Sequence, residues 1–361
     1  MNPVFATKNE LIFSSPVPKQ DEISNGQNPA ALYAQAPGSS PRRLTFGSTA
    51  ALEPTALADG RILFVSAHAA PSSGARPSFG LFTINNDGTE LTPFALDHDG
   101  ADLVRRPREL PDGRVAFLAD QARDGSGQFM AEAVRSARPF VSRAPLLPFP
   151  ASRCYSVEPS DLGTLLVCLD TRGSVGRSMT GSSAVYRIGI ETNGPGHVLF
   201  DDPAWHEVEA SALAAHSAPM GHSSAISAKK KTGTLLCLNA NFTRASASGA
   251  PAARKAVRVR VLAGACPNEC RSLGEIVLQS DGSFMAEVPS DIPLGFETLD
   301  AQGEVVQRLP PSLWVRPGEN RSCLGCHEPH NRSPRNVRPL AVLAPLAVLT
   351  NGSPTLAPKS P

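Results

Sequence analysis

One short stretch near the end of the chain combines residue types that can bind a redox cofactor. It reads Cys323-Leu-Gly-Cys326-His327. In this pattern each thiol adds to a vinyl group of a c-type haem, and the adjacent imidazole becomes an iron ligand. The stretch therefore predicts one covalently bound haem c, held by Cys323 and Cys326, with His327 as proximal iron ligand. Gly325 would leave room for the porphyrin edge.

Other chemistries use the same residue types. A zinc site in this stretch would draw on Cys323, Cys326, His327 and His330. These donors are crowded into a short stretch for a tetrahedral metal site. A thioredoxin-like dithiol would need a βαβ context, which the sequence lacks.

Other catalytic motifs are absent from the sequence, among them a Gly-rich phosphate loop, a nucleophile elbow and a His-Glu-x-x-His motif. The pair Asp201-Asp202 is more typical of a turn than of two catalytic carboxylates. Haem is the favoured interpretation.

A sixth ligand to the haem iron would have to come from elsewhere in the chain. Met220 and His222 lie with His216 in an irregular polar stretch, Ala-His-Ser-Ala-Pro-Met-Gly-His. Met220 and His222 are the candidates for a distal iron ligand, and an open or water-bound sixth position is the other expectation. His330 is too close to His327 to reach the opposite haem face.

The remaining cysteines suit structural roles. Cys168 and Cys237 lie inside apolar runs and are predicted to be buried free thiols. Cys266 and Cys270 flank Pro-Asn-Glu and are predicted to form a local disulfide in an oxidising compartment. Metal binding by that pair alone is the weaker alternative.

Composition excludes several classes of function. The chain has 34 prolines and 29 glycines in 361 residues, which favours many turns over long helices. Its net charge is +1 and it carries no basic stripe, so nucleic acid is not an expected partner. No stretch reaches the roughly 18 apolar residues that a membrane span requires. The first residues show no export signal pattern.

A repeat of about fifty residues organises the first half of the chain. Glu53-Pro-Thr-Ala-Leu-Ala-Asp-Gly-Arg-Ile-Leu-Phe recurs as Arg106-Pro-Arg-Glu-Leu-Pro-Asp-Gly-Arg-Val-Ala-Phe, and a shorter copy begins at Glu158. Several short apolar runs in each unit, joined by Asp-Gly or Asn-Gly turns, are typical of a β-propeller blade. Such blades bury both faces only by stacking against each other.

The repeats predict an all-β chain that begins with a β-propeller, partial or truncated, of about four to five recognisable blades over residues 1–204. The first copy, Asn9-Glu-Leu-Ile-Phe, matches Gly60-Arg-Ile-Leu-Phe but lacks the preceding Pro-containing strand. We therefore expect an incomplete first blade, and an upstream segment that carries this strand and an export signal or anchor.

The second half of the chain lacks the fifty-residue repeat. Residues 205–313 predict a small β-sandwich-like module, with strands at 232–241, 257–262, 274–279, 283–288 and 294–299. Residues 314–335 form the predicted haem attachment segment, and residues 336–361 a Pro-rich tail. Because this tail cannot build the helices of a self-standing cytochrome c, the propeller and the module would have to shelter the haem.

Two family resemblances add to this interpretation. The blade sequences over about residues 9–200 resemble TolB-like propellers, which implies a fold rather than a function. The run Trp314-Val-Arg-Pro-Gly-Glu-Asn-Arg-Ser-Cys, with the module before it, resembles the hydrazine synthase alpha subunit family over about residues 150–330. In that family a tyrosine four places beyond the motif histidine ligates an unusual haem. Asn331 stands at that place here, so hydrazine synthesis itself is not implied.

Taken together, the sequence predicts an exported protein, periplasmic or extracellular, that carries one haem c and transfers electrons with a redox partner protein. One alternative is a haem-dependent oxidoreductase acting on a small nitrogen or oxygen compound. Another is a non-redox propeller binding module with zinc at the Cys-x-x-Cys-His stretch. The sequence does not decide whether the chain is an enzyme, nor its oligomeric state.

Overall fold

The computed structural model shows a protein built almost entirely of β-strands. In the described part of the chain, the short 3-10 helices η1 (Thr7–Asn9) and η3 (Leu340–Leu343) accompany the strands. Among the described residues no helix is long and apolar enough to cross a membrane. The structure describes residues 3–17, 30–68, 78–95, 103–120, 128–147, 153–161, 163–170, 183–190, 196–202, 204–213, 217–244, 254–264, 270–326, 328, 332–350 and 355–356.

Four antiparallel sheets of four strands each follow one another along the chain. The first contains β1 (Val4–Phe5), β2 (Leu11–Pro16), β3 (Ala30–Gln35) and β4 (Arg42–Arg43). The second contains β5 (Ala51–Ala56), β6 (Ile62–His68), β7 (Ser78–Ile84) and β8 (Thr92–Ala95). The third contains β9 (Val104–Glu109), β10 (Arg114–Asp120), β11 (Phe129–Arg135) and β12 (Ala144–Pro145). The fourth contains β13 (Arg153–Asp161), β14 (Thr164–Asp170), β15 (Ala184–Gly189) and β16 (His197–Phe200). Within each of these sheets, every strand pairs with the strands that precede and follow it in the chain. This meander is typical of a propeller blade, and it confirms the predicted fold class.

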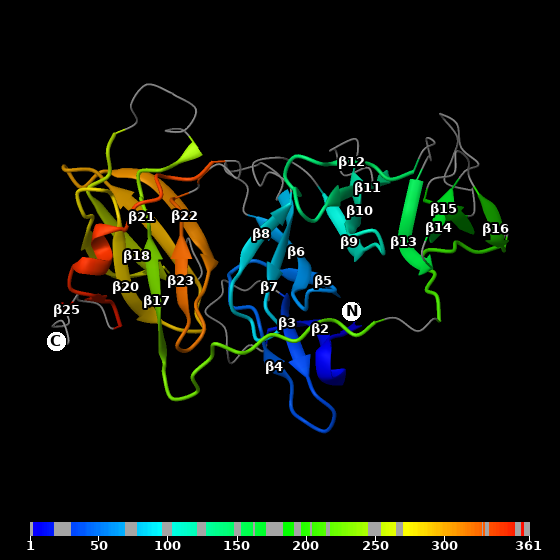
Figure 1. The fold of residues 1–361 in the computed structure, drawn as a ribbon, viewed down its shortest axis with the longest axis horizontal. Helices are drawn as coiled ribbons and strands as arrows, with labels where there is room; N and C mark the ends of the chain where they lie inside the picture. Colours follow the sequence, from blue (N-terminus) through cyan, green and yellow to red (C-terminus); the bar gives the residue numbers. More distant parts are fainter. Residues whose placement is uncertain are drawn as a thin grey trace.

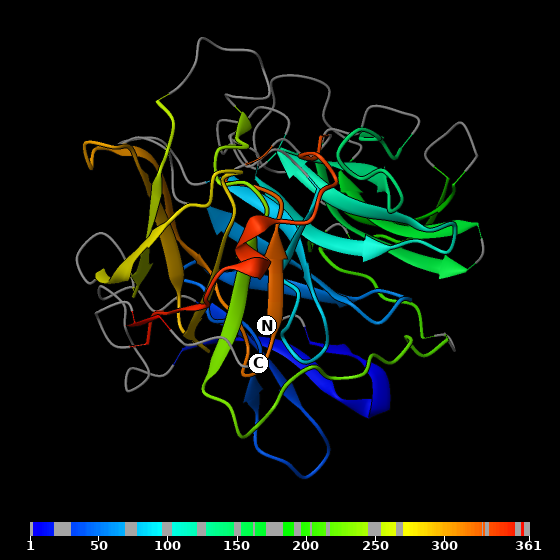
Figure 2. The same ribbon diagram turned by 60° about the vertical axis from the view of Figure 1, so that its left-hand side comes forward.

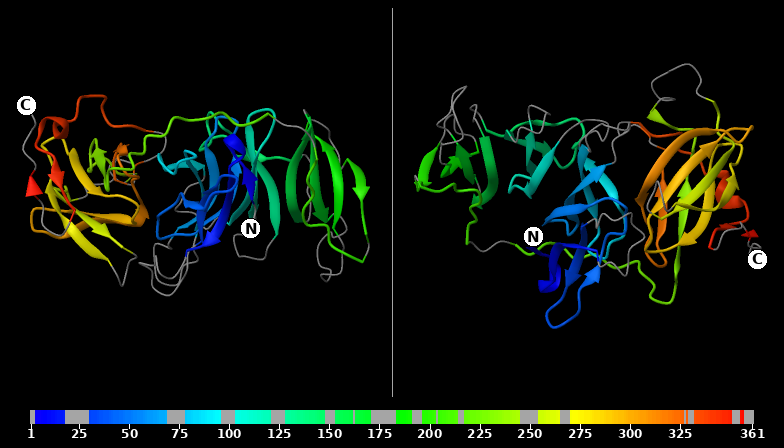
Figure 3. Two further views of the ribbon diagram at one scale, coloured as in Figure 1. Left: turned by 90° about the horizontal axis from the view of Figure 1, so that it is seen from below. Right: turned by 180° about the vertical axis from the view of Figure 1, so that it is seen from behind.

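Apolar cores lie between successive sheets and explain why the central strands are apolar throughout. Phe64 of β6 packs into the core shared by the first and second sheets. Its neighbour Leu63 packs with Phe117 between the second and third sheets. Successive side chains of a strand point to opposite faces, so β6 is covered on both sides. The views in Figures 1 and 3 show the sheets in a row, with the fourth at the end of an elongated molecule.

Charged side chains link neighbouring sheets at the repeated proline. Glu53 accepts hydrogen bonds from the backbone N–H of Arg106 and from the guanidinium of Arg105, which belong to the next sheet. One sheet further on, Arg108 donates to Glu158 at 2.6 Å. The Glu-Pro and Arg-Pro pairs of the repeat therefore fix the stacking of adjacent blades.

The prediction of a missing strand in the first blade is wrong. Strand β1 is present and pairs with β2, with Val4 opposite Ile12. The strand follows Pro3, and the turn residue Asn9 has a φ of 59° where Gly60 of the next blade has 89°. Asparagine is one of the few residues that tolerates this left-handed conformation. The strand was missed in the sequence because β1 has only two residues.

The second half of the chain forms two packed sheets, as the sandwich prediction expected. One has the order β23-β17-β20-β24-β25 and the other the order β19-β18-β21-β22. Their strands are β17 (Thr232–Cys237), β18 (Arg258–Ala263), β19 (Arg271–Val277), β20 (Phe284–Pro289), β21 (Leu294–Leu299), β22 (Val305–Leu313), β23 (Asn320–Cys323), β24 (Ala347–Val348) and β25 (Thr355–Leu356). A single core, which includes Val261 and Ala286, lies between the two sheets.

Segments predicted to lie outside the module contribute strands to it. β23 comes from the predicted attachment segment and pairs in parallel with β17, and Figure 2 shows the orange strand beside the yellow-green one. β24 comes from the predicted Pro-rich tail and pairs in parallel with β20. The boundaries at 204, 313 and 335 stay predictions. The structure adds that the Cys-x-x-Cys stretch leaves the edge of a packed sheet.

Candidate functional site

A short run after β22, here called the docking segment (residues 314–319), joins the sandwich to the first two blades. Trp314 is 4% exposed and packs into the core between the first and second sheets. Its indole N–H donates to the carbonyl oxygen of Gly88 at 3.0 Å. A Cβ added to Gly88 would lie 2.4 Å from the carbonyl oxygen of Leu44, so only glycine allows this turn to approach so closely. The tryptophan thus completes a core that belongs to the blades.

Two charged residues of the docking segment complete the contact. The guanidinium of Arg316 stacks on the ring of Phe46 and donates to the carbonyl oxygen of Arg43. Arg316 also lies 3.2 Å from a carboxylate oxygen of Asp291. Glu319 accepts hydrogen bonds from the backbone N–H groups of Glu90, in the second blade, and of Arg316. Burial outweighs these bonds and raises the pKa of Glu319.

Strand β23 begins directly after the docking segment and ends at Cys323. Arg321 and Cys323 lie two residues apart and therefore on the same face of the strand. The Arg321 guanidinium contacts the Cys323 thiol and donates to the carbonyl oxygen of Leu91 in the second blade. Cys323 is partly exposed as a residue, but burial of its thiol raises the pKa. The first motif cysteine is thus positioned at the junction of sandwich and blades.

The turn after β23 directs the second motif cysteine inward. The Cys326 N–H donates to the carbonyl oxygen of Phe242, and Cys326 is 4% exposed within the sandwich core. A Cβ on Gly325 would lie 2.1 Å from the same carbonyl oxygen. Glycine is therefore required at position 325 because the backbone of Phe242 lies so close, which the sequence did not reveal.

A third thiol lies beside the two motif cysteines. Cys237 ends β17 and is directly opposite Cys323 in the parallel register of β17 and β23. Its thiol also contacts that of Cys326. This contact, together with burial, raises the pKa of Cys237 well above its ordinary value. The predicted buried free thiols at Cys168 and Cys237 are confirmed, but the sequence gave no sign that Cys237 adjoins the motif.

Several residues that the sequence analysis named fall outside the described residues. They are the candidate ligands His216, His327 and His330, and also Asn331, which stands at the place of the family's tyrosine. Within the described ranges no group of three or more His, Cys, Asp or Glu side chains is placed to hold a metal ion. The haem and zinc assignments therefore both stay predictions.

Met220 and His222 lie on the second blade. The Met220 N–H donates to the carbonyl oxygen of Ala58. A Cβ on Gly60 would meet the Met220 carbonyl and the His222 ring. Burial acts to raise the pKa of nearby Asp59, but its hydrogen bonds and ion pair with Arg61, with a smaller contribution from His222, lower it. These contacts hold both residues against the turn between β5 and β6. A distal-ligand role for either residue stays a prediction.

The remaining sequence predictions concern ordinary structure. Cys270 is disulfide-bonded, and its predicted partner Cys266 lies outside the described residues. Asp202 accepts the N–H groups of Ala204 and Trp205, which confirms the turn predicted at Asp201-Asp202.

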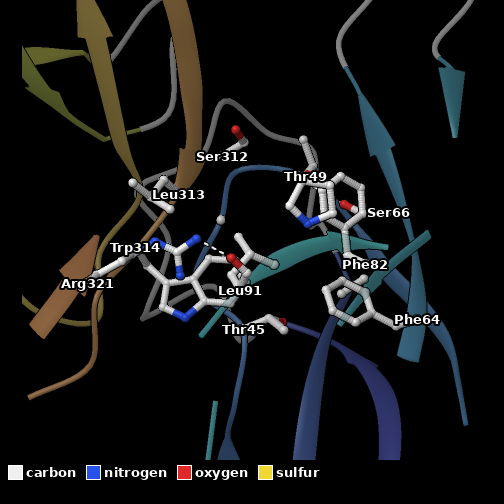
Figure 4. Close-up of a pocket in the computed structure, with 13 residues that line it drawn as sticks. Thr45, Thr49, Phe64, Ser66, Phe82, Leu91, Ser312, Leu313, Trp314 and Arg321 are labelled. Atoms are coloured by element: carbon white, nitrogen blue, oxygen red, sulfur yellow. Dashed lines mark hydrogen bonds between the residues drawn. The ribbon is translucent and has the colours of Figure 1, made fainter. Parts of the chain in front are cut away.

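A cavity of about 170 Å³ lies where the docking segment and β23 meet the first two blades. Figure 4 shows Arg321, Trp314 and Leu313 on one side, and Thr49, Ser66, Phe64 and Phe82 across from them. The complete lining is Thr45, Gly47, Thr49, Ala51, Phe64, Ser66, Phe82, Leu91, Pro93, Ser312, Leu313, Trp314 and Arg321. Arg321 therefore faces both the cavity and the Cys323 thiol, a role that sequence reasoning missed.

Comparison with known proteins supports the resemblance carried by the docking segment and the motif. Residues 228–328 match the sequence model of the hydrazine synthase alpha subunit middle domain. The fold is similar to that of a hydrazine synthase chain from Kuenenia stuttgartiensis, with a TM-score of 0.72 and 17% identity over 93% of this chain and 54% of that chain. The present chain thus spans about half the length of that protein. The predicted likeness to the hydrazine synthase alpha subunit is confirmed.

Other comparisons contribute less. The alpha-L-arabinanase of Penicillium chrysogenum is similar at a TM-score of 0.37 and 10% identity, over 88% of this chain and 82% of that chain. Likeness at this level carries no argument about function. No curated protein matches the chain by sequence.

The thiol cluster predicts slow alkylation of Cys237. The contact with Cys326 and burial raise the pKa of Cys237, so its reactive thiolate is scarcer at any given pH. At pH 8, iodoacetamide should label Cys237 at least about tenfold more slowly in the folded chain than in urea, and faster as the pH rises. Mass spectrometry of digested protein reads each cysteine separately. Equal rates in the folded and the unfolded chain would contradict the buried cluster.

Proposed function

We propose that the chain is a c-type haem protein that performs redox chemistry on a small nitrogen or oxygen compound. Haem would be joined to Cys323 and Cys326, with His327 as iron ligand. One observation carries the proposal. The motif cysteines are free thiols placed by a segment that matches the hydrazine synthase alpha subunit middle domain, and a cavity adjoins the strand that ends at Cys323.

The two motif cysteines have the chemistry that covalent haem attachment requires. Thioether formation at this motif needs two unoxidised thiols separated by two residues, and Cys323 and Cys326 meet that need. Leu324 between them is exposed, so the turn has one open side. When bound, the haem would supply one-electron chemistry at iron. The chain's own residues would hold the motif strand between sandwich and blades, and close the cavity with Trp314 and Leu313.

The proposal includes a partner and a location. A haem that cycles between oxidation states needs a redox partner protein to supply or accept electrons. Haem of this type is normally attached outside the cytoplasmic membrane, which makes a periplasmic or extracellular location part of the proposal.

Electron transfer without a bound substrate is the second candidate function. The described cavity lining supports it, because it contains no His, Asp, Glu, Lys, Cys or Tyr that could move a proton. In that case the haem would exchange electrons only with the partner protein. Its iron would then carry two protein ligands.

Covalent attachment can be tested by electrophoresis. Thioether bonds survive denaturation, so haem peroxidase staining should stay with the polypeptide. It should be lost in the Cys323→Ala, Cys326→Ala double variant. The matched control is Cys154→Ala with Cys168→Ala, which removes two buried thiols of the fourth blade. Staining that survives the motif change would overturn the assignment, and stoichiometric zinc without haem would favour the zinc-binding module.

Ligand binding separates the two redox functions. An iron with an open sixth position should be high-spin and should bind cyanide rapidly, because no protein ligand has to leave. We expect this behaviour, and expect it to be unchanged in Met220→Ala and His222→Ala. A low-spin ferric spectrum with slow cyanide uptake, converted to rapid uptake by either substitution, would instead establish the electron carrier.

A further inference from the structure

The cavity at the junction of sandwich and blades contains a cation that is short of acceptors. Arg321 has a side chain that is only 11% exposed. In the described part of the chain it donates to the carbonyl oxygen of Leu91, contacts the Cys323 thiol, and lies 3.9 Å from a carboxylate oxygen of Glu319. Its Nε is buried without a hydrogen-bond partner.

Glu319 does not supply the missing hydrogen-bond acceptor for Arg321. Its two carboxylate oxygens already accept the N–H groups of Glu90 and Arg316. A separation of 3.9 Å is too long for a hydrogen bond. A guanidinium has five N–H donors, and leaving the Nε–H of Arg321 unpaired in a buried site is costly. An acceptor in the cavity would supply what the protein does not.

The other walls define the shape of that acceptor. Phe64, Phe82 and Trp314 provide aromatic faces. The hydroxyls of Thr49 and Ser66 are 3.0 Å apart, so one of them donates a hydrogen bond to the other. The volume of about 170 Å³ is comparable with an apolar protein cavity of about 150 Å³ that holds benzene. A small inorganic anion would leave most of this space empty.

We propose that the cavity binds a small, flat carboxylate of about the size of benzoate. The carboxylate would pair with the Arg321 guanidinium, which matches its geometry, and the flat apolar body would lie between Trp314 and the two phenylalanines. The inference goes beyond the proposed redox function and holds whether or not haem is attached.

Isothermal titration calorimetry of the full-length protein tests this site, with sodium benzoate as probe, sodium nitrite as the inorganic alternative and sodium chloride as salt control. We expect saturable binding of benzoate and no change in the absorption spectrum of the protein. Arg321→Gln should weaken binding by about tenfold or more, because it removes a charge-assisted hydrogen bond. Ala51→Leu, which adds bulk to the cavity wall without removing a polar group, should abolish it.

Two controls keep the outcome clear. Arg308→Gln removes an exposed arginine of the same sandwich and should bind benzoate as the parent chain does. Circular dichroism melting identifies any variant that fails to fold. Absence of benzoate binding, binding of nitrite alone, or equal binding by folded Arg321→Gln would each overturn the proposal. Because the readout is benzoate affinity, a failure here leaves the haem assignment to be judged by its own electrophoretic test.

Discussion

The structure depends on the insertion of Trp314 into a core that belongs to another part of the chain. The indole lies between the first and second blades, and its N–H is paired with the carbonyl of Gly88. Removing this side chain would leave a void and an unpaired carbonyl, at a cost of several kcal/mol. Because β23 begins only a few residues later, the same insertion determines where Cys323 and Arg321 lie.

The charges around this insertion hold the junction in one arrangement. Arg316 reaches the backbone of the first blade and Glu319 reaches that of the second. Both groups are buried, so each would be costly without its partners. Asp87 adds a contact with Ser224, which lies in the segment between β16 and β17. Burial acts to raise the pKa of Asp87, but hydrogen bonds from Thr89 and Ser224 outweigh burial and lower it. The run Trp-Val-Arg-Pro-Gly-Glu therefore joins the sandwich to the first two blades, whatever cofactor is bound after it.

The thiol cluster places a second constraint on the site. Cys326 is a core residue of the sandwich as well as a motif residue, and Cys237 is its neighbour. A thioether at Cys326 has no S–H, so haem attachment would remove one hydrogen-bond donor from this pair. Cys237 would remain as the single thiol beside the attached group.

The fold was predictable wherever the signal was local or repeated. The spacing of Pro54 and Pro107 revealed the blades, and turn residues such as Asp281-Gly282 marked the sandwich strands. Strand β1 was missed because it has only two residues, too few for a recognisable strand pattern. Contacts between distant segments left no such signal. The indole bond of Trp314, the cavity beside Arg321 and the pairing of Cys237 with the motif all join residues far apart in the chain.

Hydrogen–deuterium exchange in a Glu319→Gln variant tests the docking account most directly. Glu319 bonds the backbone of the second blade and of the docking segment at once. If the junction holds the motif strand, exchange should accelerate together in peptides covering residues 85–91 and 320–323. Residues 164–170 of the fourth blade should not change, and neither region should respond to the exposed control Glu304→Gln. Faster exchange at 85–91 with unchanged protection at 320–323 would contradict the account.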